Sequence, residues 1–580
     1  MLPKFFSNLL LVSAVAALVS CKDATAPKVP QALAFGIKKA ALLVDDSLAA
    51  SAALTMSDGS VGNPSAISYS SSNISVASVD QRGLIRAVGE GTDTITARVG
   101  SLHDELVLTV TYAPITSVAF SIDRESILLD DTLATHAVAT NSHNLPAPNA
   151  AVTYTSSNSL VASVDVAGRV RALLLGTTKI IAREGSLADT LEITVVPQFI
   201  EIALGGAHTC GITGKHRLYC WGADSNGELG GSSPAPICVS QSIVRCSAVP
   251  IAVAGGDRFV SMTLGDFHTC ALTQGGSAYC WGANFNGAVG IGSKESNVML
   301  PTAVAGGLTF SALGAGRLHT CGVTTSGDTY CWGWDHWGQL GAGSVATDRC
   351  DFFVSNSPCS RSPVKVVGGQ IFSKVWAAES VSCGQTVAAT IFCWGVDVGG
   401  TESTGCQSGD ISRCTRTPLL QVSGELFPTF GMSYGFRCGQ KLDGSIRCWG
   451  TDFNNFGNGT GFPFRSSTPV IAAGGKAYEY GSMTLGGSHA CGMNSGSVEC
   501  WGNGFDGQPG GTVGVDRNTP GPVLALGIRF EKIVSGPVSS TSCGIATDGR
   551  TYCWGNGRFG QLGNGSMTSS AVPVQVKLVR

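Results

Sequence analysis

Short apolar strands separated by polar, glycine-containing turns recur along most of the chain. From about residue 198 one unit repeats: an apolar strand carries a cysteine, a turn follows, and a second strand ends in Cys-Trp-Gly. The copy from His268 to Gly282 reads HTCALTQGGSAYCWG. The seven Cys-Trp-Gly endings are 60, 51, 62, 55, 52 and 53 residues apart and lie at Cys220, Cys280, Cys331, Cys393, Cys448, Cys500 and Cys553. A period of this length predicts an array or a closed ring of similar sheets rather than one conventional core.

The turn chemistry of each unit agrees with a β-hairpin. In six of the seven copies nine residues separate the two cysteines, so cysteines that face each other leave a three-residue tip. Left-handed backbone is common at the last tip position, which is glycine in four copies: Gly276, Gly327, Gly444 and Gly549. Opposed residues on antiparallel strands lie about 4.5–5.5 Å apart, within reach of a disulfide. The rival interpretation is a metal array, but zinc ligands usually pair across about two to four residues, and no Cys-x-x-Cys occurs.

We therefore expect a cross-strand disulfide in each hairpin if the compartment is oxidising. The seven predicted pairs are Cys210–Cys220, Cys270–Cys280, Cys321–Cys331, Cys383–Cys393, Cys438–Cys448, Cys491–Cys500 and Cys543–Cys553. Besides Cys21, six of the 21 cysteines remain, and they predict three further local pairs: Cys238–Cys246, Cys350–Cys359 and Cys406–Cys414. Ten disulfides fit an exported chain, and the local pairing is an inference because spacing alone does not fix connectivity.

The first thirty residues predict export and a lipid anchor. Lys4 precedes an apolar run, Leu9–Val19, that is too short for a typical transmembrane helix. The run ends in Leu-Val-Ser-Cys, which resembles a bacterial lipobox and implies lipidation of Cys21; an ordinary cleaved signal is the alternative. We expect a lipoprotein signal peptide at 1–20, a tether at 21–30 and a location at the bacterial cell envelope. Lys22, in place of Asp, favours the outer membrane.

A cysteine-free region between Cys21 and Cys210 holds two copies of a different repeat, shifted by 85 residues. The first, Tyr69–Thr109, begins YSSSNISVASVDQRG, and the second, Tyr154–Thr194, begins YTSSNSLVASVDVAG. Alternating strands and turns of this kind are typical of a β-sandwich. The pattern resembles the group 2 bacterial immunoglobulin-like domains and implies two of them, at residues 31–112 and 113–197. That resemblance implies a spacer, with direct binding or adhesion as the alternative.

The full C-terminal repeat carries Gly-x-x-His-Thr-Cys, then Cys-Trp-Gly, then a turn such as Gly338–Gly341, which reads GQLG. This pattern resembles the regulator of chromosome condensation repeats, whose members form seven-bladed β-propellers. The related β-lactamase inhibitor superfamily includes a secreted propeller that grips its target with face loops. The fold class we predict is all-β: two tandem immunoglobulin-like β-sandwiches followed by a seven-bladed β-propeller at 198–580. We expect the last strand, at about Val572–Val576, to join the first blade and close the ring.

Charge and motifs narrow the possible functions. Only 13% of residues are charged and the net charge is −3, so no basic surface favours nucleic acid. We find no GxSxG, no HExxH and no phosphate loop, and we expect no catalytic residue, metal or cofactor. A residue type that recurs at one repeat position is expected to pack and hydrogen-bond; this applies to the tryptophans of Cys-Trp-Gly and to His208, His268, His319 and His489.

Irregular loops are better candidates for recognition, because loops on a rigid scaffold usually carry it. Repeats one, three and four are the longest, and each holds an extra cysteine pair that would stiffen its loop. Repeat three concentrates hot-spot residue types, and the partner-binding residues we predict are Trp334, Asp335, His336, Trp337, Phe352 and Phe353. The alternative is that these rings pack onto the propeller itself.

The leading hypothesis is therefore a monomeric, non-enzymatic surface lipoprotein whose propeller loops bind a protein or a glycan. Guanine-nucleotide exchange, the activity of the eukaryotic namesake, is the second hypothesis, and export argues against it. A propeller-based hydrolase or lyase is the third, and a solvent-facing acid–base pair on one face would favour it.

Overall fold

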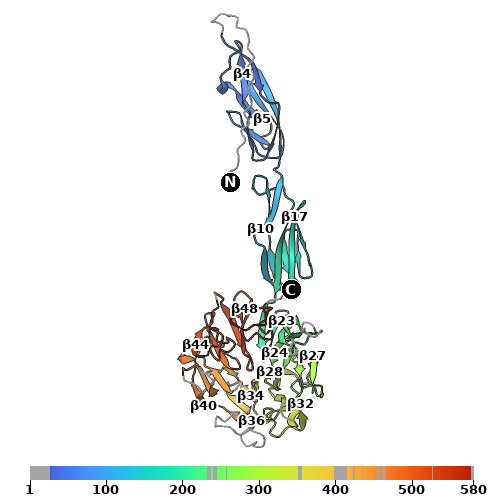
Figure 1. The fold of residues 1–580 in the computed structure, drawn as a ribbon, viewed down its shortest axis with the longest axis vertical. Helices are drawn as coiled ribbons and strands as arrows, with labels where there is room; N and C mark the ends of the chain where they lie inside the picture. The colour runs from blue at the N-terminus through green and yellow to red at the C-terminus, as the bar shows by residue number, and fades with distance from the viewer. Residues whose placement is uncertain are drawn as a thin grey trace. The chain divides into compact units, whose positions relative to one another are not determined.

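The computed structural model describes residues 27–576, apart from 232–236, 240–243, 256–257, 351–355, 397–414, 422–424, 434, 453–456, 460–463 and 526. Its strands are numbered β1 to β48 in chain order, and the short 3-10 helices are η1 (Pro64–Ala66) and η3 (Ala473–Gly475) (Figure 1). The all-β fold class is confirmed. In this described part of the chain, no helix is long and apolar enough to cross a membrane.

The chain divides into two compact units. The first comprises residues 1–119, 137–153 and 183–189, and the second comprises 120–136, 154–182 and 190–580. The first unit contains the first immunoglobulin-like sandwich, whose four-stranded sheet has the order β2-β9-β8-β5. Its strands are β1 (Pro30–Phe35), β2 (Lys39–Leu43), β3 (Ser47–Ala49), β4 (Ala52–Met56), β5 (Ser68–Ser71), β6 (Ala77–Val79), β7 (Leu84–Ala87), β8 (Gly91–Val99) and β9 (Leu102–Thr111).

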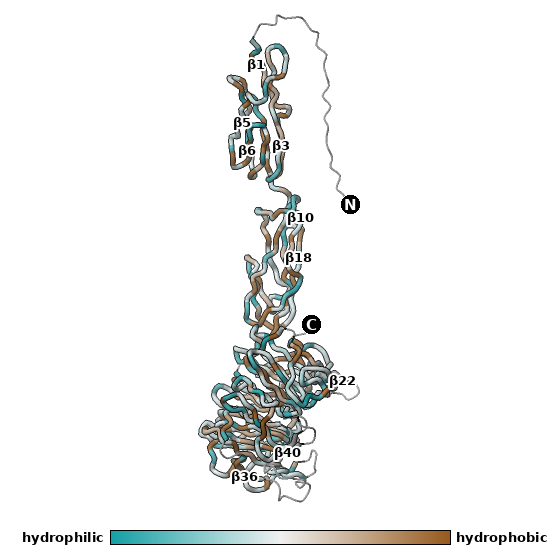
Figure 2. Tube along the Cα trace, turned by 90° about the vertical axis from the view of Figure 1, so that its left-hand side faces the viewer, coloured by the Kyte–Doolittle hydropathy of each residue, from teal (hydrophilic) through white to brown (hydrophobic). Residues whose placement is uncertain are grey.

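The second copy of the repeat has the same sheet orders, with β11-β18-β17-β14 in place of β2-β9-β8-β5. Its strands are β10 (Ile115–Phe120), β11 (Arg124–Leu128), β12 (Thr132–Ala134), β13 (Ala137–Asn141), β14 (Thr153–Ser156), β15 (Ala162–Val164), β16 (Arg169–Ala172), β17 (Gly176–Glu184) and β18 (Leu187–Val196). Apolar positions recur along the strands of both copies (Figure 2).

The Ser-Ser-Asn motif of these repeats supplies hydrogen bonds to a buried side chain. In the first copy the carboxylate of Asp93, 1% exposed, accepts hydrogen bonds from the hydroxyls of Ser71 and Ser72 and from the amide of Asn73, at 2.7–2.8 Å. A buried carboxylate requires such partners. The motif therefore fixes the loop that follows β5.

The C-terminal region forms seven sheets, each with at least four antiparallel strands taken consecutively from the chain (Figure 1). The first three blades are β19 (Phe199–Leu204), β20 (His208–Thr213), β21 (Leu218–Ala223) and β23 (Val244–Ala252); β24 (Phe259–Leu264), β25 (His268–Thr273), β26 (Ala278–Ala283) and β27 (Asn297–Ala303); β28 (Phe310–Ala315), β29 (His319–Thr324), β30 (Thr329–Trp334) and β32 (Ser357–Lys365). Blades one and three each carry a fifth strand, β22 (Ile237–Val239) and β31 (Asp348–Cys350).

The other four blades have four strands each. They are β33 (Phe372–Ala377), β34 (Val381–Thr386), β35 (Ile391–Gly395) and β36 (Thr415–Leu420); β37 (Thr429–Met432), β38 (Phe436–Gln440), β39 (Ile446–Asp452) and β40 (Phe464–Ile471); β41 (Thr484–Leu485), β42 (His489–Asn494), β43 (Ser497–Gly502) and β44 (Arg517–Pro522); β45 (Phe530–Ser535), β46 (Thr541–Ala546), β47 (Thr551–Gly555) and β48 (Ser570–Gln575).

The predicted hairpin register is confirmed in every blade. Each cysteine of the second strand lies opposite the cysteine of the third strand, as in the Cys270–Cys280 pair of β25 and β26. All seven hairpin disulfides are present, their Cα atoms are 4.0–4.1 Å apart, and their cysteines are fully buried. The disulfides are therefore part of the blade cores.

Tryptophan joins one blade to the next. The indole Nε1 of Trp332 donates to the carbonyl oxygen of Ala288 in the preceding blade, at 2.9 Å, and the hydroxyl of Thr320 donates to the same oxygen. Trp281 makes the corresponding bond to Glu228. A buried indole N–H needs such a partner. The turn approaches closely because it ends in glycine: a Cβ on Gly290, at φ 73°, would lie 2.5 Å from Nε1 of Trp332.

The ring closes in a way that corrects our prediction. The last strand, β48, pairs with β47 of its own blade and does not join the first blade. Closure comes from packing, because β45 of the seventh blade contacts β19 of the first, and Trp221 and Thr209 both donate to the carbonyl of Gln561. The first blade already contains its own first strand, β19, which pairs with β20. Each of the seven described blades therefore takes all its strands from one consecutive segment of the chain.

Candidate partner-binding surface

Strand direction decides which loops share a face of the propeller. Neighbouring strands within a blade are antiparallel, so the connection from first to second strand and the connection from third to fourth strand leave the blade at the same end. We call this end the long-loop face, because it carries the longest connections. Both additional strands, β22 and β31, arise from third-to-fourth connections and therefore belong to it. The hairpin tips lie on the opposite face.

The opposite face already has contacts within the second unit. Lys215, in the hairpin tip of the first blade, forms an ion pair with Asp130. Arg550, next to the tip of the seventh blade, donates to the carbonyl oxygen of Ser126 at 3.1 Å. These contacts join the propeller to residues of the second immunoglobulin-like domain. Loops of the long-loop face take no part in them.

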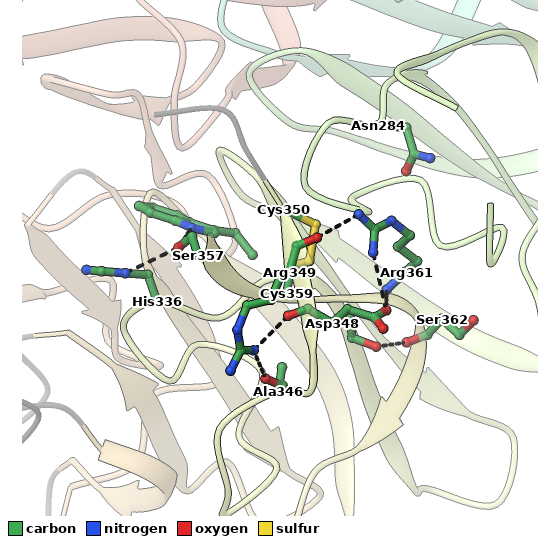
Figure 3. Close-up of a disulfide and its surroundings, with 12 residues drawn as sticks. Asn284, His336, Ala346, Asp348, Arg349, Cys350, Ser357, Cys359, Arg361 and Ser362 are labelled. Atoms are coloured by element: carbon green, nitrogen blue, oxygen red, sulfur yellow. Dashed lines mark hydrogen bonds and ion pairs between the residues drawn. A yellow bond between two sulfur atoms is a disulfide. The ribbon is translucent and has the colours of Figure 1, made fainter. Parts of the chain in front are cut away.

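A disulfide and arginine hydrogen bonds hold together the two described strands of the additional hairpin of blade three, β31 and the start of β32 (Figure 3). Its predicted disulfide, Cys350–Cys359, is present and buried. Arg349 donates to the carbonyl oxygens of Ala346 and Asp348, at 2.7 and 2.9 Å. The Arg361 guanidinium donates in turn to the carbonyl of Arg349 at 2.9 Å. Strand residues held in this way lose little conformational entropy on binding.

Two of the predicted partner-binding residues are buried, which corrects the prediction. Trp334 is 8% exposed and donates from Nε1 to the Ser357 hydroxyl at 2.7 Å. Asp335 is 1% exposed, accepts from the amides of Leu340 and Ala346, and pairs with Arg416 at 2.9 Å. The side chains fold back onto the blade because their polar atoms find partners there. They position the loop and do not present a contact surface.

The other two described members of the group, His336 and Trp337, are half-buried. The ring of His336 stacks on Trp334 with centroids 5.5 Å apart, and Trp337 meets His336 edge to face at 4.6 Å. Trp334 donates to Ser357, so the Ser357 hydroxyl proton is free to point to Nδ1 of His336, 3.3 Å away. This arrangement leaves the other ring nitrogen, Nε2, as an N–H donor. Burial lowers the pKa of His336, with a smaller contribution from the Arg416 charge.

Several predicted residues lie outside the described residues. They are the lipidation site Cys21, the pair Phe352 and Phe353, and the pair Cys406–Cys414. In the pair Cys238–Cys246, Cys246 is disulfide-bonded, and the side chain of Cys238 is not described.

The recurring histidines have the packing role that we predicted. All four recurring histidines are at most 1% exposed. Each places Nε2 2.6–2.8 Å from a hydroxyl on the next blade, and the pairs are His208 with Thr269, His268 with Thr320, His319 with Ser382, and His489 with Ser542. Burial lowers their pKa values to about 3 or 4. A neutral, fully enclosed imidazole of this kind is a structural group.

Sequence reasoning missed two groups on the long-loop face. Phe505 is 60% exposed, with the Arg558 guanidinium 5.2 Å from its ring centroid. Arg317 pairs with two carboxylates, Asp266 and Glu379, each at 3.1 Å. The second group had a signal in the sequence, since all three residues occupy one repeat position.

Comparison with known proteins agrees with this architecture. Models of the regulator of chromosome condensation (RCC1) repeat match residues 199–228, 215–272, 259–288, 326–396 and 548–580. The model of the bacterial Ig-like domain (group 2) matches residues 34–110 and 116–195. The chain thus carries RCC1 repeats and two group 2 bacterial Ig-like domains.

Similar curated proteins match through the RCC1 region. The Arabidopsis thaliana ultraviolet-B receptor UVR8 is 26% identical over 336 residues, which cover 57% of this chain and 71% of that protein. The mitochondrial RCC1 domain-containing protein RUG3 of Arabidopsis thaliana is 24% identical over 63% of this chain and 83% of its own length. The human E3 ubiquitin-protein ligase HERC2 is 26% identical, but the match covers 7% of that protein. Among solved structures, human WBSCR16 aligns with a TM-score of 0.51 at 18% identity, over 62% of this chain and 94% of that one, which supports the propeller fold.

Proposed function

We propose that this chain is a non-enzymatic lipoprotein of a bacterial cell envelope whose long-loop face binds a protein partner. One observation carries the proposal: every additional hairpin of the described propeller emerges on one face, whereas the described contacts with the Ig-like region use tips on the other. The long-loop face therefore concentrates additional loops on the propeller scaffold, the usual arrangement for recognition.

In this proposal the Ig-like domains act as a spacer and the lipid on Cys21 holds the chain at the outer membrane. Two findings support an exported bacterial protein. The matched Ig-like family is a bacterial one, and the buried disulfides require an oxidising compartment to form.

The test is affinity capture from an envelope extract with the mature, disulfide-intact chain, comparing wild type with Trp337→Ala and Leu442→Ala. Trp337 is half-buried on the long-loop face, and Leu442 is 76% exposed in a hairpin tip on the opposite face. We expect the same identified protein to be retained by Leu442→Ala and weakened by Trp337→Ala. Loss of binding with Leu442→Ala alone would show that the partner binds the opposite face. A failure to capture any protein specifically would reject the proposed function.

A further inference from the structure

A charged clamp lies among the first-to-second strand connections of the long-loop face. It consists of Asp266 in blade two, Arg317 in blade three and Glu379 in blade four. Each lies two residues before the recurring histidine position of its repeat, which is His268, His319 and Val381 respectively. Arg317 Nε lies 3.1 Å from Asp266 Oδ2, and its Nη1 donates to Glu379 Oε1 at 3.1 Å. One guanidinium therefore joins three consecutive blades.

The backbone around the clamp is adapted to it. The amide of Arg317 donates to the carbonyl of Ala378 in blade four at 3.1 Å. In blade one the equivalent position is Gly206, where a Cβ would lie 2.4 Å from Oδ1 of Asp266. The Asp266 carboxylate thus occupies the space that a side chain at 206 would need, and its position is restricted from both sides.

The two carboxylates differ in their surroundings. The side chain of Asp266 is 19% exposed and that of Glu379 is 28% exposed. Burial raises the pKa of Asp266 to about 6, Arg317 opposes the rise, and the negative charge of Glu379 adds to it. Asp266 accordingly changes its charge in mildly acidic solution, whereas an ordinary exposed aspartate does so near 4.

Few other titratable groups face Asp266. Arg317 and Glu379 are the charged groups that act on it, and His268, on its own blade, is fully enclosed and neutral in this pH range. Gly206 brings no charge from blade one. The pH response of the clamp is therefore set by three side chains, each of which can be changed separately.

We propose that this clamp makes the long-loop face pH-responsive: protonation of Asp266 releases one side of Arg317 and removes one negative charge from the binding face. This inference rests on the proposed function, because it concerns regulation of the same surface. With both carboxylates ionised the clamp carries a charge of −1, and with Asp266 protonated it carries 0. Partner affinity then changes between pH 7.5 and pH 5.

The first experiment needs no partner. The full mature chain is labelled with ¹³C-carboxyl aspartate, and the Asp266 resonance is identified by its loss in Asp266→Asn. We expect a titration midpoint near 6. Glu379→Gln should move the midpoint to lower pH, and Arg317→Gln should move it to higher pH. Glu295→Gln, which removes an exposed carboxyl from the same face, should leave it unchanged. A midpoint near the ordinary aspartate value, or no opposite shifts, would overturn the inference.

The second experiment uses the captured protein as the probe. Its Kd should change about two- to fivefold between pH 7.5 and pH 5 for wild type, as expected for one partly exposed ion pair. Asp266→Asn should lose that change and have the wild-type pH 5 affinity at both pH values. An equal change in both proteins would overturn the regulatory role. Failure to capture any protein would reject the proposed function, while the carboxyl titration would still report on the clamp.

Discussion

Acid should destabilise the propeller through its four enclosed histidines. His319 illustrates the reason: its Nε2 contacts the Ser382 hydroxyl at 2.8 Å, and that hydroxyl donates to the carbonyl of Gln339. The serine proton is thereby used, so Nε2 must carry the hydrogen that joins the two groups. The other nitrogen, Nδ1, has no hydrogen-bond partner among the described residues. A second proton there would be buried without an acceptor, which explains the low pKa.

The sign and size follow from the pKa values. Burial lowers the pKa of these histidines from 6.5 to about 3 for His208 and His319 and to about 4 for His268 and His489. The unfolded chain therefore binds protons that the folded chain excludes, and stability falls as pH drops below 6.5 towards these values. One pKa unit corresponds to about 1.36 kcal/mol, so each histidine should cost about 2 kcal/mol between pH 8 and pH 5.

The assay compares chemical unfolding of wild type and His319→Gln at pH 8 and pH 5, with disulfides intact. Glutamine keeps an N–H donor near the position of Nε2 but does not titrate. Carboxyls with raised pKa values, such as Asp266, stabilise the fold as pH falls, so the difference between proteins is the informative quantity. We expect the variant to lose about 2 kcal/mol less than wild type between the two pH values.

His216→Asn is the matched control, because His216 is exposed in a hairpin tip at φ 62°, a conformation that asparagine tolerates. It should behave as wild type at both pH values. Equal acid losses in wild type and His319→Gln would refute the reasoning, since the enclosed imidazole would then not exclude its second proton.

Three other changes test the ring and its anchor. Trp332→Phe removes the Nε1 bond to the Ala288 carbonyl and should lower the free energy of unfolding by about 1 kcal/mol or more, measured in urea; unchanged stability would show that this bond does not hold the blades together. Gly290→Ala should be more destabilising than Gly306→Ala, because both glycines have positive φ but only a Cβ at 290 meets the Trp332 ring, at 2.5 Å; equal thermal shifts would contradict the role assigned to the close approach. Cys21→Ser should move the chain from the membrane fraction to the soluble fraction on cell fractionation, and retention at the membrane would exclude the lipid anchor.

The repeat pattern predicts most of the fold. Cysteine spacing and tip glycines predicted the hairpin register, because opposition of two cysteines leaves one solution for the turn. The prediction that the last strand joins the first blade was wrong, because the sequence does not show whether the strand at residues 199–204 begins a blade or completes one. The structure resolves this by placing β19 next to β20 in the first sheet.

The candidate site was harder to predict, because residue type does not reveal burial. Trp334 and Asp335 have the composition of a binding hot spot, yet Ser357 and Arg416, distant in sequence, draw both into the blade. The clamp around Arg317 was visible only after repeats were aligned on their histidines. Local motifs predict elements well, whereas long-range partners decide which side chains remain available to a ligand.

Site-specific photocrosslinking would show which face of the propeller the partner contacts. A photoreactive phenylalanine at position 337 reports on the long-loop face, and the same residue at 442 reports on the opposite face. If the long-loop face binds the partner, the captured protein is crosslinked from position 337 and not from position 442. Crosslinking from position 442 alone would contradict it.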